Sequence, residues 1–412
     1  MPNCKVFERL PFQGACGTRQ IILESPIVKC IVQPGDGVAD LIKGIDRAKK
    51  SIEIVIFRFN RRDIEKALAS AVTRGVHVHA LIAHTNRGGE LNLRQLELRL
   101  LGAGVTVART GDDLVRYHGK LMIIDRRELF LLAFNFTYLD MERSRSFGIV
   151  TKNKKHVQEA AKLFEADTQR QPYRPSSATF VVSPLNARKQ LATFIRGAKK
   201  ELLIYDPEIA DPAMVRLLEA RSKAGVAINI IGKLTAKSSV LPEPQALQIR
   251  LHTRSILRDG TWAFVGSQSL RSLELDSRRE VGIIFRDPKV VNRLVQTFRK
   301  DWESGGKSAA RELSPEEVEQ AEAASASKVA KRVAKAVVNE LRPVTPVVET
   351  TVRELSDMAP EVNLNEREIE ATVRTAVQDA VRQVVRDFVE EAVEAHGAES
   401  RSAASKTAVS KT

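Results

Sequence analysis

Two histidines, each followed two residues later by a cation, are the residues of this chain whose types and spacing could do chemistry together. The first pair is His118 and Lys120 in "HGKLMIID", and the second is His252 and Arg254 in "HTRSILRD". Both stretches are rich in apolar residues and have the length of a strand, so side chains two positions apart project from the same face. Each stretch can therefore present an imidazole and a cation to one site.

Two imidazoles and two cations at one point suit the cleavage of a phosphodiester. A neutral imidazole can attack phosphorus and form a phosphohistidine, and a second, protonated imidazole can donate its proton to the leaving alkoxide. The pKa of histidine lies near neutrality, which allows both roles. Lysine and arginine neutralise the non-bridging oxygens as negative charge gathers there. We therefore expect that neither a metal nor a cofactor is needed, and the sequence contains no pattern of metal ligands.

The two stretches belong to a longer internal repeat. "AKKSIEIVIFRF" starts at Ala48 and "AKKELLIYDPEI" starts at Ala198, 150 positions later, whereas the two histidines are 134 positions apart. The difference of 16 residues falls in "GGELNLRQLELRLLGAG", which predicts an additional helix, closed by glycine, in the first half only. Each half reads as strand, helix, strand and then a hairpin. If two such units pack about a pseudo-two-fold axis, their histidines converge.

The repeated H-x-K-x4-D pattern, with Gly-Ser and Asn downstream, resembles the phospholipase D superfamily over residues 30–300. The resemblance implies two α/β/α halves that share one site, with one histidine as the nucleophile and the other as the general acid. Because the first copy keeps the complete His-Lys-Asn set, we assign His118 as the nucleophile and His252 as the general acid. Lys120 and Arg254 are then the catalytic cations that bind phosphate.

The two copies depart from the family pattern at different positions. The first copy has Leu132-Ala133 where the family has Gly-Ser, but it keeps Asn135. The second copy keeps Gly266-Ser267, but it has Ser269 in place of asparagine. The resemblance therefore implies that Asn135 and Ser267 assist the binding of phosphate.

Carboxylates and Arg254 leave alternatives open. In the family a glutamate helps to orient a histidine; Glu280 fits its place and can serve either histidine, while its counterpart in the first half is Ser146. Asp125 and Asp259 follow at strand ends, and we favour a turn-capping, supporting role over contact with substrate. Arginine can grip phosphate in bidentate fashion but changes the geometry relative to lysine. The site is therefore either catalytic, which we favour, or a relic that only binds phosphate.

Composition shifts predict where the halves begin and end. We expect an N-terminal extension, two phospholipase D-like halves, a helical extension and a disordered tail, at residues 1–25, 26–172, 173–305, 306–396 and 397–412. Within the extension, Ser314-Pro315 predicts a helix start, and an apolar stripe from Ile369 to Ala392 predicts a second helix. We expect this stripe to pack on another helix, including one of a second copy. The alternative for the first helix, which carries Lys328, Lys331, Arg332 and Lys335, is an anionic membrane, and we favour helix packing over it.

Charge and cysteine usage limit the partners. The net charge of +14 and a pI near 9.7 favour phospholipid head groups, other phosphates or nucleic acid. The three cysteines form no disulfide framework, and no signal peptide or membrane-span pattern is present, which predicts a cytoplasmic protein, at most peripheral at the membrane. We expect a metal-independent phosphodiesterase that hydrolyses or transfers the phosphatidyl group, as phospholipase D and cardiolipin synthase-like members do. The alternatives are a nuclease acting on DNA or RNA and a phosphate-binding protein.

Overall fold

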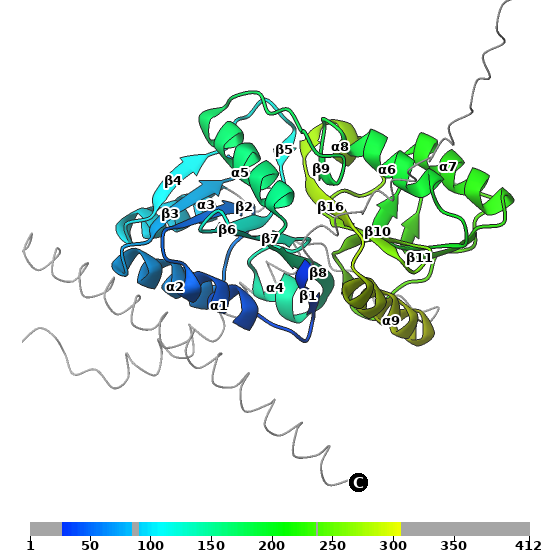
Figure 1. Ribbon diagram of the computed structural model, residues 1–412, viewed down its shortest axis with the longest axis horizontal. Helices are drawn as coiled ribbons and strands as arrows, with labels where there is room; N and C mark the ends of the chain where they lie inside the picture. The colour runs from blue at the N-terminus through cyan, green and yellow to red at the C-terminus, as the bar shows by residue number, and fades with distance from the viewer. Residues whose placement is uncertain (1–26, 85–89, 236–237, 306–412) are drawn as a thin grey trace, which may run out of the picture. The chain divides into compact units, whose positions relative to one another are not determined.

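The computed structural model describes residues 27–84, 90–235 and 238–305 (Figure 1). The chain divides into two units, residues 1–312 and 313–412, and all described residues belong to the first. The predicted N-terminal extension, helical extension and tail therefore lie outside the described residues. Within the part that is described, no helix is both long enough and apolar enough to cross a bilayer.

The first half is an α/β unit on a mixed sheet with the strand order β1-β8-β7-β6-β2-β3-β4. These strands are β1 (Ile27–Gln33), β2 (Ser51–Ile56), β3 (His77–Ile82), β4 (Thr106–Arg109), β6 (Leu121–Ile124), β7 (Glu128–Leu132) and β8 (Ser144–Thr151). The helices of this half are α1 (Ala39–Arg47), α2 (Arg62–Thr73), α3 (Glu90–Gly102), α4 (Tyr138–Glu142) and α5 (Lys154–Gln169). Strands β2, β3 and β4 are parallel, and β6, β7 and β8 form an antiparallel meander.

The second half repeats this arrangement with the strand order β11-β10-β13-β14-β16-β9. Its strands are β9 (Phe180–Val182), β10 (Glu201–Ile209), β11 (Ala227–Leu234), β13 (Arg254–Arg258), β14 (Trp262–Gly266) and β16 (Val281–Phe285). Its helices are α6 (Ala187–Arg196), α7 (Pro212–Lys223), α8 (Ser272–Asp276) and α9 (Pro288–Ser304). Strands β10 and β11 are parallel, as their counterparts β2 and β3 are in the first half.

Strand register confirms the repeat that the sequence predicts. Val55 of β2 pairs with Leu121 of β6, and Tyr205 of β10 pairs with Ser255 of β13. Tyr205 follows Val55 by 150 positions and Ser255 follows Leu121 by 134, so both sequence offsets are kept in the sheets. Among the described elements, α3 and β4 have no counterpart in the second half. The additional helix, predicted from the difference between the offsets, is therefore confirmed as α3.

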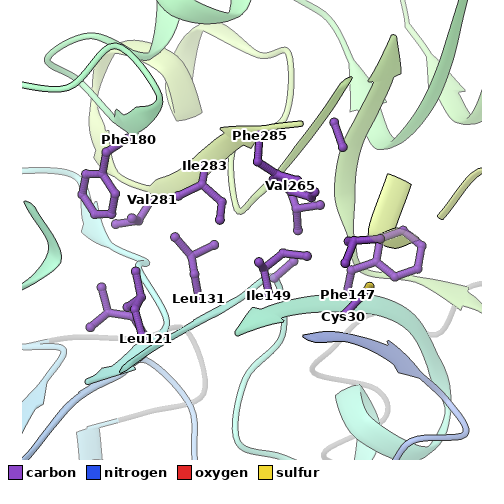
Figure 2. Packing of buried hydrophobic residues seen from close by; sticks show 14 of the residues in the cluster. Cys30, Leu121, Leu131, Phe147, Ile149, Phe180, Val265, Val281, Ile283 and Phe285 are labelled. Atoms are coloured by element: carbon purple, nitrogen blue, oxygen red, sulfur yellow. The ribbon is translucent and has the colours of Figure 1, made fainter. Parts of the chain in front are cut away.

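A single hydrophobic core joins the two sheets face to face (Figure 2). It contains Cys30, Leu121, Leu131, Phe147 and Ile149 from the first half and Phe180, Val265, Val281, Ile283 and Phe285 from the second. In β7, Leu129 and Leu131 point into this core, whereas Phe130 points into a second core on the other face. Because both faces of the sheet are buried, the sequence of β7 from Leu129 onward is a continuous apolar run and does not alternate.

Candidate active site

Two short strand pairs cross between the halves immediately before the two histidines. Strand β5 (Arg116–Tyr117) pairs with β15 (Arg278–Arg279), and β12 (Arg250–Leu251) pairs with β8. The backbone N–H of His118 then donates to the carbonyl of Arg279 (2.8 Å), and that of His252 donates to the carbonyl of Arg145 (3.0 Å). Each half thus fixes the histidine of the other, and both histidines lie along the seam between the sheets.

His118 is oriented by a carboxylate from the opposite half. Its Nδ1 lies 2.8 and 3.0 Å from the two carboxylate oxygens of Glu280, which is fully buried. The ring of Phe57, at the end of β2, packs edge-on against it with the centroids 4.5 Å apart. These contacts fix the plane of the imidazole and leave Nε2 as the nitrogen that can face a substrate.

Electrostatics favour a neutral His118. Burial, followed by the charges of Lys120 and Arg254, lowers the pKa of His118 well below its usual value. Burial also raises the pKa of Glu280 to about 7, although Lys120 and Arg254 act in the opposite direction. Above that pH the carboxylate is ionised and accepts the Nδ1 proton, so the lone pair of His118 is on Nε2. Such an imidazole can act as a nucleophile.

His252 has different partners. A guanidinium nitrogen of Arg250 lies 3.0 Å from its Nδ1, and Oδ2 of Asp140, in α4, lies 3.1 Å from its Nε2. The carboxylate of Asp140 thus faces Nε2 and favours a proton on it. Burial lowers the pKa of His252 to about 3, although the charge of Asp140 acts in the opposite direction.

Lys120 and Arg254 make the same backbone contact in the two copies. Lys120 Nζ donates to the carbonyl of His118 (2.7 Å), and Arg254 Nη1 donates to the carbonyl of His252 (2.8 Å). Arg254 also donates through Nε to Ser269 (3.1 Å). Burial lowers the pKa of Lys120 to about 7, because a charged ammonium is poorly solvated there. Arg254 thus makes the backbone contact that is equivalent to that of Lys120, and it makes an additional hydrogen bond to Ser269.

Two carboxylates that the sequence analysis did not select hold the loops after β7 and β14. Asp140 Oδ2 accepts from the backbone N–H of Asn135 (2.8 Å) and from its side-chain amide (2.7 Å). Glu274 accepts from the backbone N–H of Ser269 (2.7 Å). Asp140 and Glu274 are 134 positions apart, as the two histidines are, and that spacing was the available signal.

The remaining predicted residues fall in two places. Asn135 and Ser267 are both buried. The Ser267 hydroxyl accepts from the backbone N–H of Val281 (3.1 Å), which lies two residues after Arg279, the backbone partner of His118. Asp125 and Asp259 lie at the opposite ends of β6 and β13, outside the cluster. Each carboxylate accepts three successive backbone N–H groups, those of residues 49–51 for Asp125 and 199–201 for Asp259, at 2.7–3.1 Å.

Comparison with known proteins agrees with the repeat. A family model described as "Cardiolipin synthase, PLD-like domain" matches residues 41–168 and 191–302, one segment in each half and together more than half of the chain. The chain is similar to a polyphosphate kinase of Vibrio parahaemolyticus, with 26% identity over 293 residues, 63% of this chain and 41% of that protein. It is similar to a phospholipase D of Rickettsia felis, with 27% identity over 136 residues, 32% of this chain and 64% of that protein. The chain thus spans less than two thirds of either relative.

Among solved structures, the polyphosphate kinase of Porphyromonas gingivalis has the same fold over 71% of this chain and 54% of that chain, with a TM-score of 0.57 and 17% identity. The match of the family model to both halves is the decisive finding, because it covers both histidine motifs. The chain belongs to the phospholipase D superfamily, through the family described as "Cardiolipin synthase, PLD-like domain".

Proposed function

We propose that the protein hydrolyses or transfers the phosphatidyl group of a phospholipid through a phosphohistidine on His118. The observation that carries this proposal is the bond from His118 Nδ1 to the buried carboxylate of Glu280, which leaves a nucleophilic Nε2 beside Lys120 and Arg254. The two cations neutralise the non-bridging oxygens of the phosphate. Asn135 and Ser267 support the phosphate-binding loops.

The reaction has two balanced steps. In the first, Nε2 of His118 attacks phosphorus, the bond from phosphorus to the head-group oxygen breaks, and His252 gives that oxygen a proton. In the second, water or an alcohol attacks the phosphohistidine, the P–N bond breaks, and the acceptor's proton returns to His252. The negative phosphate beside His252 favours its imidazolium form, which opposes the effect of burial on its pKa.

Three observations support a lipid substrate. The matching family model is described as a cardiolipin synthase domain, and the Rickettsia felis relative is named a phospholipase D. The chain also carries a net charge of +14, which favours anionic surfaces.

Phosphatidyl transfer to ethanol tests the proposal directly. The purified protein is incubated with mixed phospholipid vesicles, ethanol and EDTA, and phosphatidylethanol is measured. We expect its formation, its loss in His118→Ala and in His252→Ala, and its retention in His77→Ala, which removes an exposed histidine of β3. Full activity in either site variant, or no phosphatidylethanol with any phospholipid, would refute the assignment.

A second candidate is phosphoryl transfer with polyphosphate. The specific observation in its favour is the likeness to a polyphosphate kinase over 293 residues and 63% of this chain, whereas the phospholipase D match covers 136 residues and 32%. Nε2 of His118 could attack the terminal phosphorus of a phosphoanhydride, so that the bridging P–O bond breaks and a phosphohistidine forms. Shortening of polyphosphate by the wild type and not by His118→Ala, without any phosphatidylethanol, would favour this candidate. Cleavage of DNA in the same comparison would instead favour a nuclease.

A further inference from the structure

The two histidines differ in what binds Nδ1, and the difference determines where each imidazole carries its proton. At His118 the partner is the carboxylate of Glu280, which in its ionised form can only accept. At His252 the partner is the guanidinium of Arg250, at 3.0 Å, which can only donate. Nδ1 of His252 must therefore be the acceptor, and the proton of the neutral ring is on Nε2.

Arg250 is itself held in place. Its Nη1 donates to Asp140 Oδ1 (2.6 Å) and to the hydroxyl of Ser144 (2.9 Å), which leaves Nη2 directed at His252. Glu280 would have its counterpart at Ser146, 134 positions earlier, and a serine supplies no carboxylate to the second histidine. At Nδ1 of His252, Arg250 with its partner Asp140 occupies the place that the carboxylate of Glu280 occupies at Nδ1 of His118.

The equivalent arginine in the first half is used differently. Arg116 precedes His118 by two residues, as Arg250 precedes His252, but its guanidinium carbon lies 5.4 Å from the centre of the Phe57 ring. The same residue type at the same spacing thus contacts an aromatic ring in one half and an imidazole nitrogen in the other. Arg116 therefore provides a matched control for Arg250.

We propose that Arg250 is a positioning residue that holds His252 in the Nε2–H tautomer, opposite to that of His118, and thereby confines the phosphohistidine to His118. This inference rests on the proposed function for its second part. An Nε2 that carries a proton has no lone pair for phosphorus, so in this tautomer His252 cannot form the phosphohistidine. Oδ2 of Asp140 lies 3.1 Å from this nitrogen and favours a proton there. The groups that face His252 are Asp140, Arg250 and Arg254.

Nitrogen NMR of the full chain, labelled with ¹⁵N-histidine and free of substrate, tests the tautomers at pH 8. The signals of the two rings are assigned by their loss in His118→Gln and His252→Gln. We expect a protonated Nδ1 in His118 and a protonated Nε2 in His252. In Arg250→Met the His252 pattern should change, in Arg250→Lys it should persist because an ammonium also only donates, and in Arg116→Met it should be unaffected.

A protonated Nδ1 on His252 in the wild type would overturn the inference, as would an unchanged His252 pattern in Arg250→Met. Circular dichroism checks that each variant is folded, and if Arg250→Met is not, the wild type and Arg250→Lys still decide the tautomer. Quenched reactions are then mapped by mass spectrometry, and we expect the phosphoryl label on His118 alone. Label on wild-type His252 would refute the confinement. The predicted tautomers without label on either histidine would refute the proposed function but keep the role of Arg250 in setting the tautomer.

Discussion

Replacing Glu280 by glutamine should make the protein more stable and less active. Glutamine keeps the shape of the side chain and an oxygen that can accept the Nδ1 proton of His118, but it removes a buried negative charge. During attack on phosphorus, positive charge develops on His118, and only the carboxylate stabilises it. We therefore expect turnover to fall on the order of 10²–10⁴-fold.

The gain in stability follows from the pKa of Glu280, which burial raises from 4.5 to about 7. Between these values the folded protein binds more protons than the unfolded chain, so stability falls as the pH rises, and the whole loss is present above pH 7. The difference between these two pKa values corresponds to about 3 kcal/mol. Glutamine avoids this cost, but Lys120 loses the carboxylate that favours its charged form, so about 3 kcal/mol is an upper limit.

Urea unfolding at pH 5 and pH 8 measures this difference. The advantage of Glu280→Gln over the wild type should be small at pH 5 and should increase at pH 8. Glu159→Gln is the matched control: Glu159 is also buried, but hydrogen bonds from Tyr173 and Ser176 lower its pKa, so this variant should lose stability at pH 8. A Glu280→Gln variant that is less stable than the wild type at pH 8, or a difference independent of pH, would refute the reasoning.

Two further predictions concern residues of the repeated motif. Asp125→Ala should lower the free energy of unfolding by about 2 kcal/mol, because three backbone N–H groups lose a half-buried charged acceptor. It should leave KM unchanged, and a change in KM with unaltered urea unfolding would contradict a purely structural role. Arg254→Lys should keep turnover within about tenfold, since Lys120 makes the equivalent contact in the first half, whereas Arg254→Met should lose about 100-fold or more. Steady-state rates compare the two variants, and full activity of Arg254→Met would mean that Arg254 does not bind the reacting phosphate.

The fold could be predicted from the sequence because the repeat records it twice. Each offset between equivalent residues corresponds to a register in the sheets, and the difference between the offsets marks the position of α3. Alternation, by contrast, does not identify β7, since both of its faces are buried and its residues after Glu128 are all apolar. The internal repeat therefore predicts this strand, which the local hydrophobic periodicity does not.

The partners of the two histidines could not be predicted in this way. The family pattern pointed to Glu280 but not to the histidine that it serves, because the contact joins residues 162 positions apart in different halves. Asp140 and Arg250 belong to no conventional motif. Their contacts with His252 depend on the pairing of β12 with β8, which places the guanidinium between a carboxylate and an imidazole.

A duplicated unit begins with two equivalent histidines, yet the reaction needs one that attacks and one that donates a proton. The two copies of this chain keep equivalent backbone contacts for Lys120 and Arg254, so the cations do not distinguish the histidines. The histidines differ in the residue that contacts Nδ1, which is the carboxylate of Glu280 for His118 and the guanidinium of Arg250 for His252. Substitutions at Ser146 and Arg250 should therefore reassign the roles of the histidines more readily than exchange of the cations that contact phosphate.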